Sequence, residues 1–367
     1  MVAVAAWITL GVWAGLALCH GGFWCTDQRL PPPGRPQRWP SVAIVVPARD
    51  EAEVVPTTLP TLLAQRYPGR ARVILVDDDS TDGTGDLARG LARSGLPLTV
   101  STPGEPPPGW TGKLWAVAHG VAEAGDVDYL LLTDADIAHG PGTLCDLVMS
   151  AEGGRDLVSQ MALLRTETRW ERLIVPAFVY FFAMLYPFRR VNKPKARTAA
   201  AAGGCVLVRR QVLADAGGVA AIRGAVIDDV ALARLVKRAG GRIWLGLAET
   251  VHSVRAYPRL ADLWQMIARS AYTQLNLSPW LLAGTVVGMA VVFLAPPVLA
   301  IAALSWPAAV AWLLMAATFV PMARYYGRFP AAGLCLPVTA FLYTAMTVDS
   351  ARRHWLGRGA GWKGRNY

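Results

Sequence analysis

The chain has 367 residues, of which 53% are hydrophobic and only 17% are charged, and its mean hydropathy is +0.33. This composition is too apolar for an ordinary soluble enzyme and indicates a membrane protein. The formal net charge is +10. Since no basic cluster contains interleaved aromatic residues, we exclude nucleic-acid binding and expect an anionic lipid surface or a phosphate-bearing substrate.

The first apolar segment is Val2–Cys19, which is long enough to span a bilayer. No Lys or Arg precedes it, so a cleaved signal peptide is the weaker interpretation. We assign residues 1–24 to an N-terminal transmembrane helix and residues 25–40 to a Pro-rich basic linker. Because Arg29, Arg35 and Arg38 follow the span, we expect the next domain to be cytoplasmic in a multi-pass protein of a bacterial-type inner (cell) membrane.

The middle part, residues 41–277, reads as alternating strands and helices. Strands are predicted at Ser41–Ala48, from Ala71, near Leu98 and at Asp128–Thr133, and a helix is predicted at Gly112–Ala124. This βαβαβ alternation predicts an α/β domain with a largely parallel sheet. Ligands of such sheets bind beyond the carboxyl ends of the strands.

Acidic residues follow two of these predicted strands, in "VDDDS" (Asp77–Asp79) and in "TDAD" (Asp134 and Asp136). Carboxylates at the ends of buried strands need a compensating charge. A divalent cation with a diphosphate supplies it, and hard oxygen ligands favour Mg²⁺ or Mn²⁺. The competing interpretation of this DxD motif is a helix N-cap or an Asx turn at Asp136.

Four segments in order, "VAIVVPARDEAEVV", "VILVDDDSTDGT", "TDAD" and "IDDVALARLVKRAG", resemble family 2 glycosyltransferases. The resemblance covers residues 41–275. It implies the GT-A fold, a nucleotide-diphospho-sugar transferase domain with a Rossmann-like, mostly parallel sheet, here flanked by transmembrane helices. "GWTGKLWAVAHG", "IVPAFVYFFAMLYPF" and the flanking apolar segments look more narrowly like the branch associated with hopanoid biosynthesis.

The resemblance implies roles for individual residues. The nucleotide-sugar would be bound by Pro47, Ala48, Arg49, Glu51, Asp77, Asp78, Lys113, Asp134, Gly203, Gly204 and Arg269. The metal would be bound by Asp136 with Asp134, and by His252, whose alternative is a structural histidine. Lys113 is poorly placed for a helix start, because the positive end of the helix dipole repels it, and this favours a ligand role. Asp79 stands where many relatives carry Gly.

The catalytic pair implied by the resemblance is Asp228-Asp229. Asp229 would be the base that removes the acceptor's proton in an inverting single displacement, and Asp228 replaces the family's Glu. The same pair could cap the helix that follows, and the two roles do not exclude each other. Polymerising relatives carry QxxRW, whereas this chain has Gln265, Arg269 and then Ser270, which argues against a processive synthase.

The apolar C-terminal part, residues 278–350, is expected to hold two to three transmembrane segments. Trp280–Ala323 lacks charged residues and fits two spans, with a turn at Pro296-Pro297 or at Ser305–Pro307. Ala331–Val348, with Pro337 inside it, is a third candidate. Three spans would place the basic tail, residues 351–367, outside the cell. Either the last segment is a re-entrant hairpin or the positive-inside rule fails here.

An apolar aromatic stretch at residues 173–190 is predicted to be an interfacial helix that delivers a lipid acceptor to the site. The expected function is transfer of a sugar from a nucleotide-diphospho-sugar, a UDP-sugar, to a lipid in hopanoid or lipid biosynthesis. One alternative is a polyprenyl-phosphate glycosyltransferase, with Arg189, Arg190, Lys193 and Lys195 on the acceptor phosphate. The other is a non-catalytic membrane scaffold or transporter, which the uncharged Trp280–Ala323 segment disfavours. A nucleotidyltransferase is disfavoured by the acidic "ARDEAEVVP".

Overall fold

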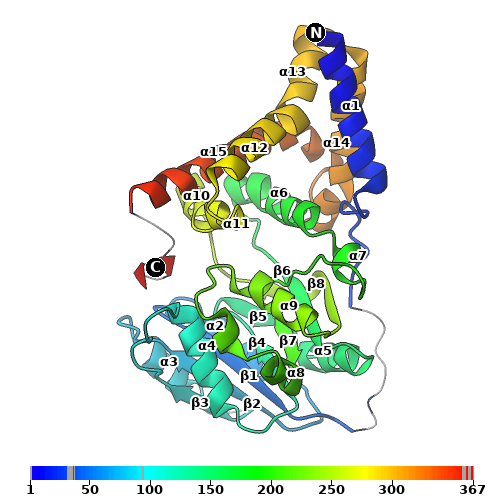
Figure 1. The fold of residues 1–367 in the computed structure, drawn as a ribbon. Helices are drawn as coiled ribbons and strands as arrows, with labels where there is room; N and C mark the ends of the chain where they lie inside the picture. The colour runs from blue at the N-terminus through cyan, green and yellow to red at the C-terminus, as the bar shows by residue number, and fades with distance from the viewer. Residues whose placement is uncertain are drawn as a thin grey trace.

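The computed structural model describes residues 2–30, 36, 38–92, 95–357, 361–362 and 365–366. Figure 1 shows an α/β domain below a set of long helices, with the N-terminus at the far end of those helices. Parts of the predicted linker and of the basic tail, including Arg35, Arg358 and Lys363, lie outside the described residues.

The α/β domain is built on an eight-stranded sheet with the order β3-β2-β1-β4-β7-β6-β8-β5. The strands are β1 Val42–Ala48, β2 Ala71–Asp77, β3 Leu98–Ser101, β4 Tyr129–Leu132, β5 Ile137–His139, β6 Leu157–Leu163, β7 Val206–Arg209 and β8 Ile243–Ser253. Strands β3, β2, β1 and β4 are parallel, as are β6 and β8, while β7 is antiparallel to both its neighbours and β5 is antiparallel to β8. The prediction of an α/β domain with a mostly parallel sheet is confirmed.

Both faces of the sheet are covered, which explains why its strands are apolar along their whole length. Every residue of β1 is buried. Ala43 and Val45 pack into one core cluster, while Val42, Ile44 and Val46 pack into the other. The covering helices are α2 Val55–Leu63, α3 Thr84–Gly90, α4 Gly112–Glu123, α5 Thr143–Glu152, α8 Arg210–Asp215, η1 Val219–Ile222 and α9 Asp228–Arg238.

Five helical segments of the described chain are long and apolar enough to cross a membrane. They are Val2–Cys19 (α1), Arg169–Val191, Pro279–Ala302, Trp306–Tyr325 (α14) and Pro330–Trp355. Arg169–Val191 comprises α6 Arg169–Leu185 and α7 Phe188–Val191, and Pro330–Trp355 comprises η3 Pro330–Cys335 and α15 Leu336–Trp355. Their helical length and apolar composition are what a span requires.

The segment Pro279–Ala302 does not turn at its proline pair. It consists of α12 Pro279–Met289, a π-helical turn η2 Ala290–Leu294 and α13 Ala295–Ala302, with Pro296-Pro297 at the start of α13. The wider π turn accommodates prolines that lack a backbone N–H. Of the two predicted turn positions, the proline pair is therefore wrong, and the chain instead reverses between Ala302 and Trp306.

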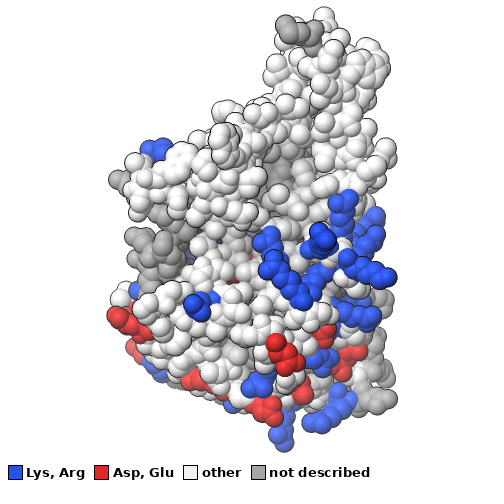
Figure 2. All heavy atoms as spheres, in the orientation of Figure 1, with Lys and Arg blue, Asp and Glu red and all other residues white. Residues whose placement is uncertain are grey.

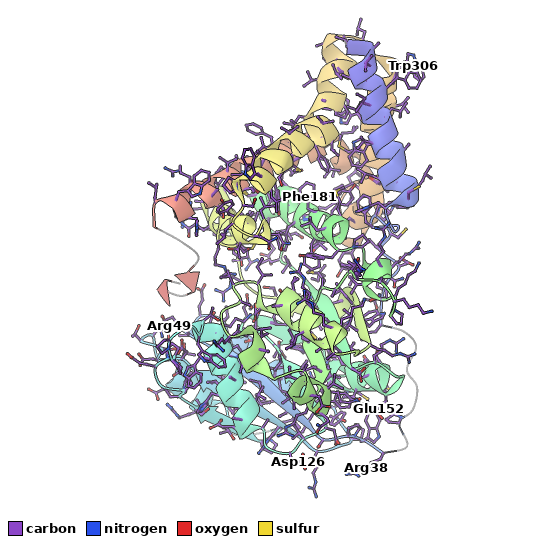
Figure 3. The ribbon with its side chains drawn as sticks, viewed as in Figure 1. Arg38, Arg49, Asp126, Glu152, Phe181 and Trp306 are labelled. Carbon is purple, nitrogen blue, oxygen red and sulfur yellow. The ribbon has the colours of Figure 1, made fainter. Side chains whose placement is uncertain are left out.

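Helix α6 joins the α/β domain to the apolar helices. Its N-terminus has a capping box, in which the buried Glu171 carboxylate accepts hydrogen bonds from the backbone of Glu167, Thr168 and Tyr257. Further along, the Tyr180 hydroxyl lies 2.7 Å from Thr318 Oγ1 in α14. Phe181, labelled in Figure 3, stacks edge-on against Phe293 and Tyr343 of the apolar helices.

Basic side chains of α7 bind the end of α1 and the segment that follows it. Arg189 pairs with Asp27 at 2.9 Å, and Arg190 donates to the carbonyl of Cys19, the last residue of α1. Figure 2 shows Lys and Arg gathered at this level, below an upper region almost free of charge. A charge-free region above a basic belt is the arrangement expected at an anionic membrane surface.

Candidate active site

The first part of the site lies where β1 and β2 end. The backbone N–H of Asp78 donates to the carbonyl of Ala48, and Arg49 Nη1 lies 3.4 Å from Asp78 Oδ2. Figure 3 shows Arg49 at the edge of the α/β domain nearest the apolar helices. Asp77 ends β2 and accepts from the backbone of Ser80 through Oδ1. The turns after the two strands therefore form one polar edge.

Asp79 occupies a left-handed backbone position, with φ +55°. Glycine adopts this conformation without strain, and Asp is among the few other residues that tolerate it. This geometry explains why Asp stands in this chain at a position where Gly is expected.

Lys113 supplies the positive charge that Asp134 needs. It lies in the first turn of α4, which Thr111 caps through the backbone N–H of Leu114. Its Nζ is 2.8 Å from Asp134 Oδ1 and 2.9 Å from Asp228 Oδ2. Burial lowers the pKa of Lys113, but the two carboxylates outweigh it and the net pKa is raised. Lys113 is thus charged at neutral pH and links the DxD motif to the second acidic pair.

Asp136 has its own counter-ion, Arg255, which was not among the predicted site residues. Arg255 Nε is 2.8 Å from Asp136 Oδ2, and its Nη2 is 2.8 and 2.6 Å from the two carboxylate oxygens of Glu51. Residues 137–139 continue from Asp136 as strand β5, so the helix N-cap interpretation of the DxD motif is wrong. Arg255 stands in "VHSVRAY", two residues after β8, and sequence alone does not pair it with an acid.

The acidic pair begins α9. Ile227 is the N-cap and makes no side-chain capping bond, so neither Asp228 nor Asp229 is the N-cap. Both lie in the first turn of α9, where the helix dipole favours acids, as expected. Asp229 Oδ2 accepts from the backbone N–H of Gly203 at 2.9 Å, and Oδ1 accepts from that of Val230 at 2.7 Å.

The surroundings of Asp229 favour its protonated form. Burial, followed by the charge of Asp228, raises the pKa of Asp229 to about 7, although Lys113 and the two backbone N–H groups act in the opposite direction. A carboxylate with this pKa takes up protons far more readily near neutral pH than an ordinary Asp does.

These groups line a pocket of about 430 Å³, including its open mouth. Its lining residues are Pro47, Lys113, Leu114, Val117, Leu132, Thr133, Asp134, Gly203, Val206, Val219, Ile222, Asp228, Asp229 and Leu232. A Cβ added to Gly203 would lie 3.6 Å from both Asp229 and Lys113 Nζ, so the absence of a side chain keeps this space open.

The remaining predicted site residues are distributed around this pocket. Gly204 packs against Ile137 and accepts from Thr133 Oγ1 through its carbonyl, so it supports the DxD turn. Arg269 is exposed and follows α10 (Leu260–Ala268), and it does not line the pocket. Its charge nevertheless acts on the pKa of Tyr257, which places it near the same wall of the site.

The DxD carboxylates suit one hard cation. Lys113 binds Oδ1 of Asp134 and Arg255 binds Oδ2 of Asp136, so one oxygen of each carboxylate receives no hydrogen bond from the described residues. Mg²⁺ and Mn²⁺ are commonly held by one or two carboxylates together with substrate phosphates, and these oxygens fit that arrangement. A three-ligand site is not formed: the described residues contain no such group of His, Cys, Asp or Glu, and His252 is exposed.

Parts of this chain are similar in sequence to known proteins. Residues 43–217 match the family model described as "Glycosyl transferase family 2". A 4,4'-diaponeurosporenoate glycosyltransferase of Staphylococcus haemolyticus is 32% identical over 97 residues, which are 26% of this chain and 24% of that protein. A probable glycosyltransferase of Bacillus subtilis, YdaM, is 31% identical over 126 residues, which are 32% of this chain and 29% of that protein. The chain thus spans only about a quarter of each relative's length.

One solved structure resembles almost the entire chain. It is the mannosyltransferase PcManGT from Pyrobaculum calidifontis in complex with GDP-Man and Mn²⁺. The TM-score is 0.61 at 20% identity, and the match covers 98% of this chain and 100% of that one. At this identity the likeness concerns the fold. The family match over residues 43–217 and this likeness of fold together support a family 2 glycosyltransferase domain with the GT-A fold.

Proposed function

We propose that the chain is a membrane-bound, inverting glycosyltransferase that moves a sugar from a nucleotide-diphospho-sugar to a lipid hydroxyl. The observation that carries this proposal is Lys113, whose ammonium group joins Asp134 of the DxD motif to Asp228 of the acidic pair. Donor phosphates and an acceptor's base have to lie close together for a single displacement, and Lys113 draws the two groups of acids into one pocket.

The donor would lie along the edge formed by the turns after β1, β2 and β4. We assign the nucleotide to the turns that contain Arg49, Asp77 and Asp78, and the diphosphate to Lys113 and the DxD motif. A cation bound to Asp134 and Asp136 would neutralise the charge that builds up on the leaving diphosphate. The charges along this edge favour no single nucleotide, so UDP, expected from the sequence, is to be compared with GDP.

Asp229 is the proposed base. Its carboxylate is held in place by the backbone N–H groups of Gly203 and Val230, and it faces the pocket. In the proposed step the acceptor oxygen gives its proton to Asp229 and attacks the anomeric carbon, while the bond from that carbon to the diphosphate oxygen breaks on the opposite side. Asp228 stays with Lys113 and orients it.

The lipid acceptor is inferred from the position of α6. This helix packs between the domain and the apolar helices. Tyr186 directly follows it and is close enough to Asp229 for an electrostatic interaction between the two side chains. The hopanoid association rests on the motif resemblance of residues 109–120 and of α6. Lipid profiling of a deletion strain tests both: loss of a glycosylated hopanoid or other lipid is expected, and an unchanged lipid profile would contradict the assignment.

The polyprenyl-phosphate alternative is less well supported. Two of the four basic residues proposed for the acceptor phosphate are already engaged, since Arg189 pairs with Asp27 and Arg190 donates to Cys19. Lys193 and Lys195 are exposed in the loop that follows α7. A scaffold or transporter would not need the half-buried Lys113 and the paired acids, which lie in the α/β domain.

The membrane arrangement is part of the proposal. Helix α14 ends at Tyr325, whose hydroxyl donates to the carbonyl of Ala248 in β8. Near the end of α15, Asp349 accepts from Trp264 of α10, and Ser350 accepts from the backbone of Tyr272. The end of α14 thus contacts the α/β domain, and the end of α15 contacts residues 264–272, which link that domain to the apolar helices. This supports a re-entrant α15 with the basic tail on the cytoplasmic side, as the positive-inside rule requires.

Replacing Asp229 by Asn separates catalysis from folding. Asn accepts one of the two backbone hydrogen bonds but takes up no proton at neutral pH, so the stability loss is about 1–3 kcal/mol. Loss of a general base lowers the rate by roughly 10²–10⁴. We expect Asp229→Asn to bind donor and to transfer almost no sugar to lipid in a radiolabel assay. Asp228→Asn, the matched control, retains the base and should lose less. Near-normal turnover by Asp229→Asn would remove Asp229 from the mechanism.

The pH dependence should report Asp229. The base acts only when deprotonated, so kcat/KM is expected to fall as pH drops through about 7, the raised pKa of Asp229. Asp228 raises that pKa, and Asp228→Asn should therefore move the acidic limb to lower pH. The measurement is kcat/KM between about pH 5 and pH 9 for both proteins. An acidic limb that stays in place or moves to higher pH in Asp228→Asn would contradict the assignment.

Cysteine labelling tests the membrane arrangement. In a cysteine-free background that remains active, Ala303→Cys lies in the turn between α13 and α14, and Gly357→Cys lies after α15. We expect a membrane-impermeant maleimide to label the first site in intact spheroplasts and the second only after permeabilisation. Labelling of Gly357→Cys in intact spheroplasts would show that α15 crosses the membrane.

A further inference from the structure

Arg255 occupies the centre of an acid cluster that the reaction scheme leaves unexplained. It lies two residues beyond β8, and its guanidinium bridges Glu51, from the turn after β1, to Asp136, from the turn after β4. Those acids are 204 and 119 residues away from it along the chain. Burial lowers the pKa of Arg255, but the charges of Asp136 and Glu51 outweigh burial and raise the net pKa. The guanidinium is therefore charged throughout the physiological range.

The bridge fixes which oxygen of Asp136 is available. Oδ2 accepts from Arg255 Nε at 2.8 Å and from Ser253 Oγ at 3.3 Å. The carbonyl of Asp136 accepts from the backbone of Val254 at 2.9 Å, which holds the whole residue against the segment after β8. Oδ1 receives no hydrogen bond from the part of the chain that the structure describes. Asp136 therefore presents one oriented oxygen, beside a fixed positive charge.

The same bridge already balances the charge of Asp136. Lys113 does the same for Asp134 at 2.8 Å, so each DxD carboxylate has a protein cation in contact. A divalent ion at the free oxygens would lie in the repulsive field of both cations. The diphosphate of a donor adds negative charge and further oxygen ligands, which reverses this balance.

We propose that Arg255 is a positioning residue that aims Asp136 at the metal and makes metal binding depend on the donor diphosphate. The inference deepens the proposed function and rests on it for the identity of the donor. In the donor-free enzyme, Arg255 keeps the affinity of the DxD motif for divalent ions low. When the donor is present, the same contact holds Asp136 in the orientation that completes the site.

The test measures Mn²⁺ binding to the full-length protein in detergent, by the loss of the free Mn²⁺ signal in electron paramagnetic resonance. Mn²⁺ is titrated alone and then with saturating UDP or GDP. For the wild type we expect Mn²⁺ to bind at least about tenfold more tightly with a nucleoside diphosphate than without it. Equal affinity in the two titrations would overturn the proposal.

Variants at Arg255 give the decisive contrast. Arg255→Met and Arg255→Gln remove the charge, and we expect Mn²⁺ alone to bind about tenfold more tightly or better, while the gain on adding nucleotide shrinks. Arg255→Lys keeps the charge and should resemble the wild type in the titration with Mn²⁺ alone. Unchanged or weaker binding of Mn²⁺ alone to a folded neutral variant would contradict the role of Arg255.

Arg259→Met is the matched control. Arg259 also pairs with a carboxylate, that of Asp262 at 3.0 Å, but on the exposed surface of α10. Its removal should leave both Mn²⁺ titrations unchanged, and a change as large as that of Arg255→Met would show a nonspecific effect of charge and overturn the proposal. Because the titration with Mn²⁺ alone needs no donor or acceptor, it still reports on Arg255 if sugar transfer to lipid is not observed.

Discussion

The contact on which the rest of the site depends is the ion pair network of Lys113. Two acids at the carboxyl edge of the sheet and at the start of α9 would repel each other without it, and desolvation would favour their protonation. With Lys113 Nζ at 2.8 Å from Asp134 and 2.9 Å from Asp228, one ammonium group holds both. The opening of α4 at Thr111 places this lysine at the pocket despite the unfavourable helix dipole.

Much of the α/β half could be predicted from local sequence. Continuous apolar runs identified β1, β2 and β4, because strands covered on both faces are apolar throughout. The acids that end β2 and β4 had to meet at one edge, since parallel strands end together. Strands β5, β6, β7 and β8 were not predicted. The antiparallel pairing of β7 with β4 and β6, for example, is set by contacts distant in sequence.

The site contacts that could not be predicted from the sequence also join residues that lie far apart along the chain. Nothing near Arg255 indicates that it will bridge Glu51 and Asp136, and His252, three residues earlier, was the more obvious metal ligand. In a β-strand successive side chains face opposite sides, so a shift of one residue decides which side chain reaches a turn. Helix α9 likewise begins at Asp228, with Ile227 as its N-cap, whereas the acidic pair itself was expected to be the cap.

The apolar helices and the site are connected through α6. Its buried Glu171 accepts from the backbone of Tyr257, two residues after Arg255, while Tyr180 and Phe181 pack on α14 and α15. The wall that holds Asp136 is thus continuous with the helix that meets the apolar bundle. This continuity is consistent with the proposed route of the acceptor along α6.

The most direct test of the central claim is nucleotide binding to Lys113→Met, measured by calorimetry with UDP or GDP and Mn²⁺. If Lys113 carries the donor diphosphate, the variant should lose at least about tenfold in affinity for the nucleoside diphosphate, while binding of the corresponding nucleoside stays unchanged. Lys193→Met, which removes an exposed lysine outside the pocket, should bind like the wild type. Unchanged diphosphate affinity in folded Lys113→Met would contradict the account.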